Sequence, residues 1–228
     1  MGERIIHPLC ERRPSASASV LVIITSDAGL CGAYNTNLIS LAEAQLKADS
    51  RTPVQLVLIG RQGARYFTKR GYRVMASYLD LAGRPTPSTV RQIATSLMEA
   101  FLDKRVGNVR VVYTRFVSAT VYRPTVEQWL PIQTSDIRHQ TSEMEYIFEP
   151  TPERVFEELL PRLAIAKFQQ MVLEAFTSEH SARMIAMKNA TDNATELLDA
   201  LTLQRNKVRQ ASITKELSEI VGTAEALR

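Results

Sequence analysis

The residues most suggestive of chemistry lie in a short glycine-containing turn, Ser26-Asp-Ala-Gly-Leu-Cys-Gly32. The turn follows an apolar run and precedes a helical pattern, which is where doubly wound domains bind phosphate groups. Its glycines, Gly29 and Gly32, are spaced Gly-x-x-Gly, whereas a dinucleotide fingerprint needs Gly-x-Gly-x-x-Gly and a Walker loop needs Gly-Lys-Ser/Thr. We expect a tight turn rather than a nucleotide site. The alternative is that the chain is an α/β nucleotide-binding enzyme that dimerises through a helix at its C-terminus.

Nucleophilic and metal chemistry have little support in the other polar residues. Cys31 would need a neighbouring base, but no histidine is close to it in the sequence. Cys10 and Cys31 form no Cys-x-x-Cys pair, and His7, His139 and His180 have no partner at metal-ligand spacing. We therefore expect a packed cysteine at position 31, no metal, no cofactor and no catalytic site.

A second group of polar residues lies near the C-terminus, in a segment with a helical pattern. Residues three and four apart are neighbours on a helix, so Arg209, Gln210, Thr214 and, less closely, Glu216 face neighbouring sides of two turns. We predict that they form a ladder of hydrogen-bonding side chains. On a helix surrounded by water such a ladder would have no function. Whether these residues are functional therefore depends on whether a partner packs against this side of the helix.

Alternating strand and helix patterns must position the glycine turn. The β-branched run Val20–Thr25 predicts a buried strand, and the segment Ala33–Ala48 predicts a helix that Asn35 or Thr36 could cap. A second such unit has its strand at 54–59 and its helix from 61 to about 69, stopped by Gly71. We expect further strands at 72–78 and 109–114, a helix after 85–88, and hairpin-like edge strands within 116–132. This order predicts an α/β fold, a Rossmann-like central domain with a mostly parallel sheet.

A long C-terminal helix follows the domain. Thr151-Pro-Glu153 is typical of a helix start, and Pro161 is expected to interrupt or kink the helix. The 67 residues after Pro161 contain no proline and one glycine, and would extend about 100 Å as a single helix. We therefore predict three segments: 1–18 as a lead-in remnant, 19–150 as the α/β central domain and 151–228 as a long coiled-coil helix.

The apolar pattern of this helix changes phase. A coiled-coil-like spacing holds at first and then resumes after a five-residue step between Val208 and Ile213, whereas a plain dimeric zipper would keep one register. The first stripe is Ala190, Ala194, Leu197, Leu201 and Val208, and the second is Ile213, Leu217, Ile220, Ala224 and Leu227. We infer that the helix meets different partners along its length.

Composition and charge exclude several classes of protein. The chain is 45% hydrophobic and 23% charged, as in soluble globular proteins, and it has no apolar run of membrane-spanning length and no signal-peptide pattern. We expect a cytoplasmic or equivalent compartment. The net charge of +4 comes from the first 154 residues, with 19 Lys and Arg against 14 Asp and Glu. This excess is too diffuse to indicate nucleic-acid binding.

Four blocks, read in order, resemble the gamma subunit family of F-type ATP synthases. They are Thr25-Ser-Asp-Ala-Gly-Leu-Cys-Gly-Ala-Tyr-Asn35, Tyr146-Ile-Phe-Glu-Pro150, Ser178 to Ala194, and Arg205 to Gly222. The resemblance extends from about His7 to Leu227. It implies an α/β domain carrying two long helices, of which the C-terminal helix is normally half of an asymmetric antiparallel coiled coil.

The resemblance also implies a function and partners. Such a chain is the non-catalytic rotor subunit of a proton-translocating ATP synthase, which transmits torque between the membrane c-ring and a catalytic ring of alpha and beta subunits, with the epsilon subunit as a further partner. The long helices of such a subunit form a shaft that must act differently on three identical catalytic sites, so the shaft must itself lack three-fold symmetry. The phase change in the apolar pattern agrees with this. It would lie peripherally on the cytoplasmic face of a bacterial plasma membrane. The matrix side of the mitochondrial inner membrane is the less favoured location.

Position in the matching motifs assigns contact or coupling roles to Arg183, Arg209, Gln210, Thr214 and Glu216. The same motifs imply that the glycine turn shapes the first βα loop and binds no nucleotide. One departure is large, because the family has a long N-terminal helix before the segment resembling 7–14. We interpret the chain as an N-terminally truncated form, or one starting at an internal methionine. A structural adaptor unrelated to ATP synthase is the third possibility.

Overall fold

The structure, a computed structural model, describes residues 7–11, 18–49, 53–81, 85–133, 149 and 151–226. The helices and strands, in chain order, are η1 (Pro8–Cys10), β1 (Ala18–Ile24), α1 (Tyr34–Ala48), β2 (Val54–Ile59), α2 (Arg61–Lys69), β3 (Val74–Tyr78), α3 (Pro87–Leu102), β4 (Val106–Phe116), β5 (Tyr122–Leu130) and α5 (Pro152–Ala226). The chain divides into two compact units between Met184 and Ile185, and α5 contributes to both. The first unit includes the sheet.

One five-stranded sheet has the order β3-β2-β1-β4-β5. The neighbouring strands from β3 to β4 pair in parallel, and β5 pairs antiparallel with β4. The mostly parallel sheet predicted from the sequence is therefore confirmed. The expectation of edge strands holds for β5, whose Pro124 lies in an outer strand where no second ladder needs its missing N–H. Its partner β4, by contrast, is an interior strand.

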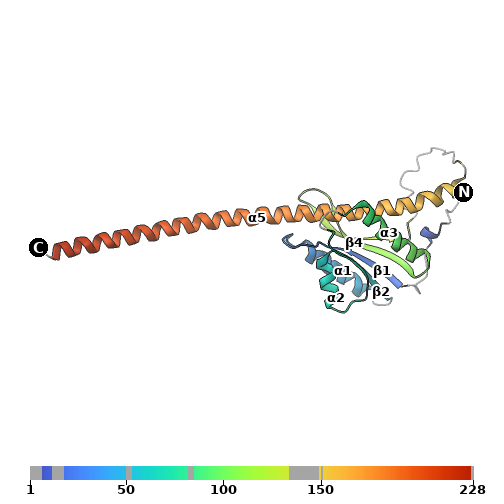
Figure 1. The fold of residues 1–228 in the computed structure, drawn as a ribbon, viewed down its shortest axis with the longest axis horizontal. Coiled ribbons are helices and arrows are strands. Elements are labelled where there is room, and N and C mark those ends of the chain that lie inside the picture. The colour runs from blue at the N-terminus through green and yellow to red at the C-terminus, as the bar shows by residue number, and fades with distance from the viewer. Residues whose placement is uncertain are drawn as a thin grey trace. The chain divides into compact units, whose positions relative to one another are not determined.

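Helices cover both faces of the sheet (Figure 1). Successive strand residues point to opposite faces, so Val22 of β1 packs in the cluster shared with α3 and α5, while Leu21 packs with α1 and α2. Both side chains are fully buried. This two-sided burial explains why β1 after Ser19 and β2 after Gln55 are apolar at successive positions rather than at alternating ones.

The first part of α5 is packed on the sheet. Its inward positions recur three and four residues apart, so one face of the helix is apolar and buried. Trp129 of β5 donates its indole N–H to the carbonyl of Ala164 at 2.8 Å, and its ring lies 4.9 Å from that of Phe168. The inward residues are Leu160, Ala164, Phe168, Met171, Val172, Ala175, Phe176 and Ala182. They explain why the first compact unit reaches Met184.

The start of α5 is as expected, but its proline does not interrupt it. Thr151 Oγ1 accepts a hydrogen bond from the Arg154 N–H at 3.4 Å, as a capping residue does. The helix then continues through Pro161. Proline removes one helical N–H, which leaves the carbonyl of Glu157 without its usual donor. Glu157 is exposed, so water can satisfy that carbonyl, and the buried Leu160 and Ala164 hold this part of the helix on the core.

Glycine is required where β2 ends. Gly60 has a φ of +94°, and a Cβ placed there would lie 2.0 Å from the carbonyl oxygen of Thr25. The ends of β1 and β2 approach each other this closely because Thr25 N donates to the carbonyl of Ile59 at 2.8 Å. The helix stop predicted at Gly71 also holds, because this residue has a φ of +75° just after α2.

Candidate functional site

The loop after β1 is bonded to the neighbouring βα unit. Thr25 Oγ1 donates to the carbonyl of Ile59 at 3.1 Å and accepts from the N–H of Gly63 at 2.9 Å. Asp27 Oδ1 accepts from the N–H of Arg61 at 2.9 Å and from the N–H of Asp80 at 3.2 Å. The carboxylate of Asp27 therefore occupies the N-terminal end of α2, where an anion would otherwise be favoured.

Asn35 has a role different from the predicted one. We expected Asn35 or Thr36 to cap the first helix, but α1 begins after Ala33 with no side-chain cap. Asn35 instead turns back to the loop, where its Oδ1 accepts from the N–H of Ser26 at 3.0 Å and its Nδ2 donates to Cys31 Sγ at 3.2 Å. Long-range loop closure takes precedence here over the local capping preference.

The same contacts disfavour the nucleotide-binding alternative. A phosphate at a βα turn is bound by free backbone N–H groups, but the N–H of Ser26 is already bonded to Asn35, and a carboxylate caps the adjacent helix. Gly32 has a φ of +57°, as expected for a residue that shapes a turn. Cys31 is 2% exposed, and its sulfur lies 3.2 Å from Asn35 Nδ2 and 3.8 Å from Ser26 Oγ, which fits a packed thiol.

Arg183 joins the glycine loop to α5. Its Nη2 lies 2.7 Å from Glu179 Oε1, one turn earlier on the same helix. Its Nε donates to the carbonyl of Gly29 at 3.3 Å, and Nη2 also reaches the carbonyl of Ala28 at 3.5 Å. The side chain of Glu179 is 4% exposed and that of Arg183 is 24% exposed. Arg183 therefore neutralises a buried carboxylate and fixes the loop with the same guanidinium group.

Two buried hydrogen bonds strengthen this junction. Tyr34 donates its hydroxyl to the carbonyl of Ala175 at 2.9 Å, and Ser178 Oγ donates to the carbonyl of Thr114 at 3.1 Å. Burial, with the Glu179 carboxylate nearby, raises the pKa of Tyr34 far above its ordinary value, so its hydroxyl stays protonated as the donor. We call the contacts of Tyr34, Ser178, Glu179 and Arg183 the loop–helix junction.

A second polar cluster was not predicted from the sequence. Glu127 of β5 accepts from the hydroxyl of Tyr113 at 2.9 Å and from Arg115 Nη2 at 2.8 Å, and it lies 3.1 Å from Lys167 Nζ of α5. Burial alone would raise the pKa of Glu127, but hydrogen bonds from Tyr113 and Lys167, and the positive charges, hold it below its usual value. Tyr113 and Arg115 are two residues apart on a strand, so their side chains lie on the same face of the sheet. This spacing is the sequence signal that could have indicated the cluster.

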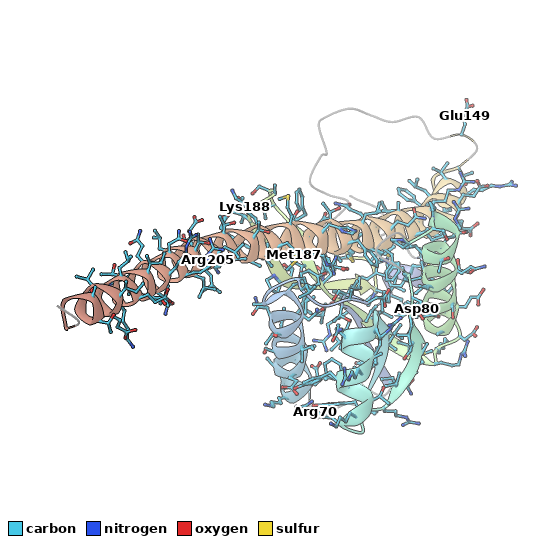
Figure 2. The ribbon with its side chains drawn as sticks, turned by 60° about the vertical axis from the view of Figure 1, so that its left-hand side comes forward. Arg70, Asp80, Glu149, Met187, Lys188 and Arg205 are labelled. Carbon is cyan, nitrogen blue, oxygen red and sulfur yellow. The ribbon has the colours of Figure 1, made fainter. Side chains whose placement is uncertain are left out.

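In the second compact unit, every described side chain of α5 from residue 187 to 224 is exposed. Met187, Lys188 and Arg205 mark this part of the helix in Figure 2, where side chains project in all directions. The large apolar side chains among them are Met187, which is 36% exposed, and Leu197, Leu198, Leu201, Leu203, Val208, Ile213, Leu217, Ile220 and Val221, each at least 45% exposed. A run of exposed apolar side chains of this length indicates a surface that a partner covers.

The phase change predicted for the stripe follows from the helix itself. At about 100° per residue, the five-residue step from Val208 to Ile213 rotates the apolar side by about 140°. α5 is a continuous helix through this step, so no local break brings the second stripe back into line with the first. The two stripes therefore face different directions.

The predicted polar ladder does not form. Arg209, Gln210, Thr214 and Glu216 all lie on α5 and are exposed, as expected. Within the described part of the second unit, however, no hydrogen bond joins their side chains to one another. Thr214 donates instead to the carbonyl of Gln210 at 2.9 Å, and Glu216 accepts from Ser212 at 3.3 Å. Threonine satisfies itself more readily on its own helix than with a neighbouring side chain.

Other classes of site find no support in the described residues. No group of three His, Cys, Asp or Glu among them could hold a metal ion. None of the described helices is long and apolar enough to cross a bilayer.

Comparison with known proteins gives one consistent family. The family model described as ATP synthase matches residues 2–227. The ATP synthase gamma chain of Symbiobacterium thermophilum is 45% identical over all of this chain and 79% of its own length, and that of Moorella thermoacetica is 43% identical over 97% of this chain and 77% of its own length.

Solved structures show the same fold. The mitochondrial ATP synthase of Euglena gracilis (OSCP/F1/c-ring, rotational state 3) contains a chain with a TM-score of 0.64 and 22% identity, covering 93% of this chain and 73% of that one. The central stalk and c-ring structure of the Tetrahymena thermophila mitochondrial ATP synthase gives a TM-score of 0.61 at 21% identity, covering 79% of each chain. The α/β fold with a long C-terminal helix is therefore shared with these chains.

Proposed function

Because the chain belongs to the family of ATP synthase gamma chains, the rotor subunits of F-type ATP synthases, we propose that it transmits torque between a membrane c-ring and a catalytic ring of alpha and beta subunits. The subunit itself is not catalytic. The enzyme that it serves would be a proton-translocating ATP synthase, with an epsilon subunit as a further partner. The chain would be held peripherally at the cytoplasmic face of the membrane through the complex.

The observation that carries this proposal is the exposed part of α5. A helix in a protein owes most of its stability to an apolar face that packs against another part of the structure. Here residues 187–224 are all exposed and include ten large apolar side chains. A surrounding ring would supply the missing cover. The rotation of about 140° between the two stripes means that such a ring would meet a different surface at different heights.

Asymmetry of this kind suits a shaft. Identical subunits around an axis can be held in different conformations only by differential contacts with what lies at the centre. The exposed Arg209, Gln210, Thr214 and Glu216 are available for such contacts, because the hydrogen bonds of Thr214 and Glu216 are made within α5 itself and leave all four side chains at the surface. Arg183 differs from them. We propose that it acts on coupling through the loop–helix junction as well as through any contact of its own.

Co-purification tests the function. The tagged chain is co-expressed with the alpha and beta subunits of a bacterial F-type ATP synthase, and we expect both subunits to be recovered with it. Leu197→Glu, which places a charge on the first stripe, should abolish recovery. The matched control is Thr195→Glu, two residues away and about 160° round the helix, which should keep it.

The opposite results would refute the proposal. A folded chain that recovers neither subunit would favour the adaptor interpretation. Tight ATP binding by the isolated chain, measured by calorimetry, would restore the nucleotide-binding alternative.

A further inference from the structure

The outer face of α2 carries a row of exposed cations. Arg61, Arg65 and Lys69 are four residues apart, so their side chains follow one another on one side of the helix in steps of about 6 Å. Arg70 and Arg73 continue the charge beyond the helix end, and all five residues are exposed. In Figure 2 the labelled Arg70 lies near the end of α2. We call these five residues the α2 cationic face.

Little negative charge offsets this face. The sequence contains no Asp or Glu between Asp49 and Asp80. Arg61 pairs with Asp80, and Arg70 Nε lies 3.9 Å from Glu43. Among the described residues, no ion pair is found for the three other members of the face, Arg65, Lys69 and Arg73. The face therefore keeps a net positive charge, although two of its five cations are paired.

The aromatic side chains of this segment are already occupied. Phe67 is fully buried in the core, and the half-buried Tyr72 packs edge-on against it with the ring centres 5.3 Å apart. Tyr66 donates its hydroxyl to Glu43 at 2.7 Å, and the guanidinium of Arg70 lies 3.6 Å from the centre of its ring. The exposed positions of the face are therefore charged or polar and offer neither an apolar anchor nor a free ring.

This composition selects among the possible anionic partners. A specific protein interface is built round buried aromatic or apolar anchors, and single-stranded nucleic acid is bound by stacking on free aromatic rings. A lipid surface requires neither, since spread cations suffice and each guanidinium can pair with a phosphate through two N–H groups. We propose that the α2 cationic face binds the anionic phosphate headgroups of a membrane surface. The proposal rests on the proposed function, which brings the chain close to a membrane.

Vesicle co-sedimentation of the intact chain tests this. We expect binding to phosphatidylcholine vesicles that contain phosphatidylglycerol, none to phosphatidylcholine alone, and loss of binding as salt rises. Each cation at an anionic surface contributes about fivefold, so Arg65→Gln with Lys69→Gln should weaken binding about 25-fold. The matched control, Lys188→Gln with Arg205→Gln, removes the same charge from exposed positions of α5 and should bind like the unchanged chain.

Three outcomes would overturn the proposal: equal binding to both vesicles, an equal loss in the control, or displacement by RNA at concentrations below those of the lipid. The last would assign the face to nucleic acid. The proposed function is tested separately, because the Arg65 and Lys69 variant should still recover the alpha and beta subunits. Vesicle binding without recovery of those subunits would refute the rotor function and leave the lipid surface standing.

Discussion

Glu179 and Arg183 form an ion pair of 2.7 Å on consecutive turns of α5, and Arg183 also donates to the carbonyl of Gly29 in the loop after β1. The carboxylate is almost completely buried, so the pair is not an ordinary surface i,i+4 contact. It joins two segments more than 150 residues apart in the sequence. This part of α5 is therefore held to the domain by charge as well as by apolar packing.

Removing Arg183 should destabilise the first compact unit. In Arg183→Ala the buried Glu179 carboxylate loses its partner, and we expect the free energy of unfolding to fall by about 3 kcal/mol, measured by urea denaturation. The double variant Arg183→Gln with Glu179→Gln removes both charges and should recover much of that loss. If the double variant were no more stable than Arg183→Ala, the effect would come from the lost loop contacts and not from the unpaired charge.

Tyr113 should make the protein sensitive to alkaline pH. Burial, with the hydrogen bond to Glu127, raises the pKa of Tyr113 to about 12, above the value of about 10 in an unfolded chain. The folded state thus holds this proton more tightly. The stabilisation is complete below pH 10 and is lost as pH rises through 12, by about 2–3 kcal/mol. Tyr113→Phe should lose stability less steeply over that range, and an identical slope would show that Tyr113 is not the group responsible.

Gly60 and Gly29 should differ sharply in their tolerance of a methyl group. Gly60→Ala would place Cβ 2.0 Å from a backbone oxygen at a positive φ, so we expect a loss of more than about 3 kcal/mol or no folded protein. Gly29→Ala adds a Cβ that meets nothing within 4 Å and should change stability by less than about 0.5 kcal/mol. Thermal unfolding of the two variants checks both values. Comparable losses would mean that the loop has a different backbone conformation.

The elements were predictable because their signals are local. β1 and β2 follow from continuous apolar runs, and α2 ends where Gly71 adopts its positive φ. Interactions between distant segments were not predictable in the same way. Nothing near Glu127 in the sequence indicates that Lys167 of α5 will reach it, and nothing near Asn35 indicates that it will bond to Ser26 rather than cap its own helix. Such contacts depend on sheet order and on which helix covers which face.

The residues proposed for coupling were assigned by resemblance to a family rather than from a local sequence pattern. Arg209 and Gln210 lie on a fully exposed helix, where side-chain spacing alone predicted a ladder that does not form. An exposed helix has no buried environment to force polar side chains together, so each satisfies itself on its own backbone or in water. Their function can therefore be tested only with partners present.

Arg209→Ala with Gln210→Ala should reduce coupled activity without changing the fold. Neither side chain makes a hydrogen bond or ion pair within the described residues, so we expect the thermal midpoint of the isolated chain to stay the same. In a reconstituted complex, loss of contacts that bias the ring should lower ATP synthesis about tenfold. The matched control is Lys215→Ala, also exposed and about 120° round the helix from Arg209, which should keep full activity. Equal losses in both variants, or none in either, would remove Arg209 and Gln210 from the coupling surface.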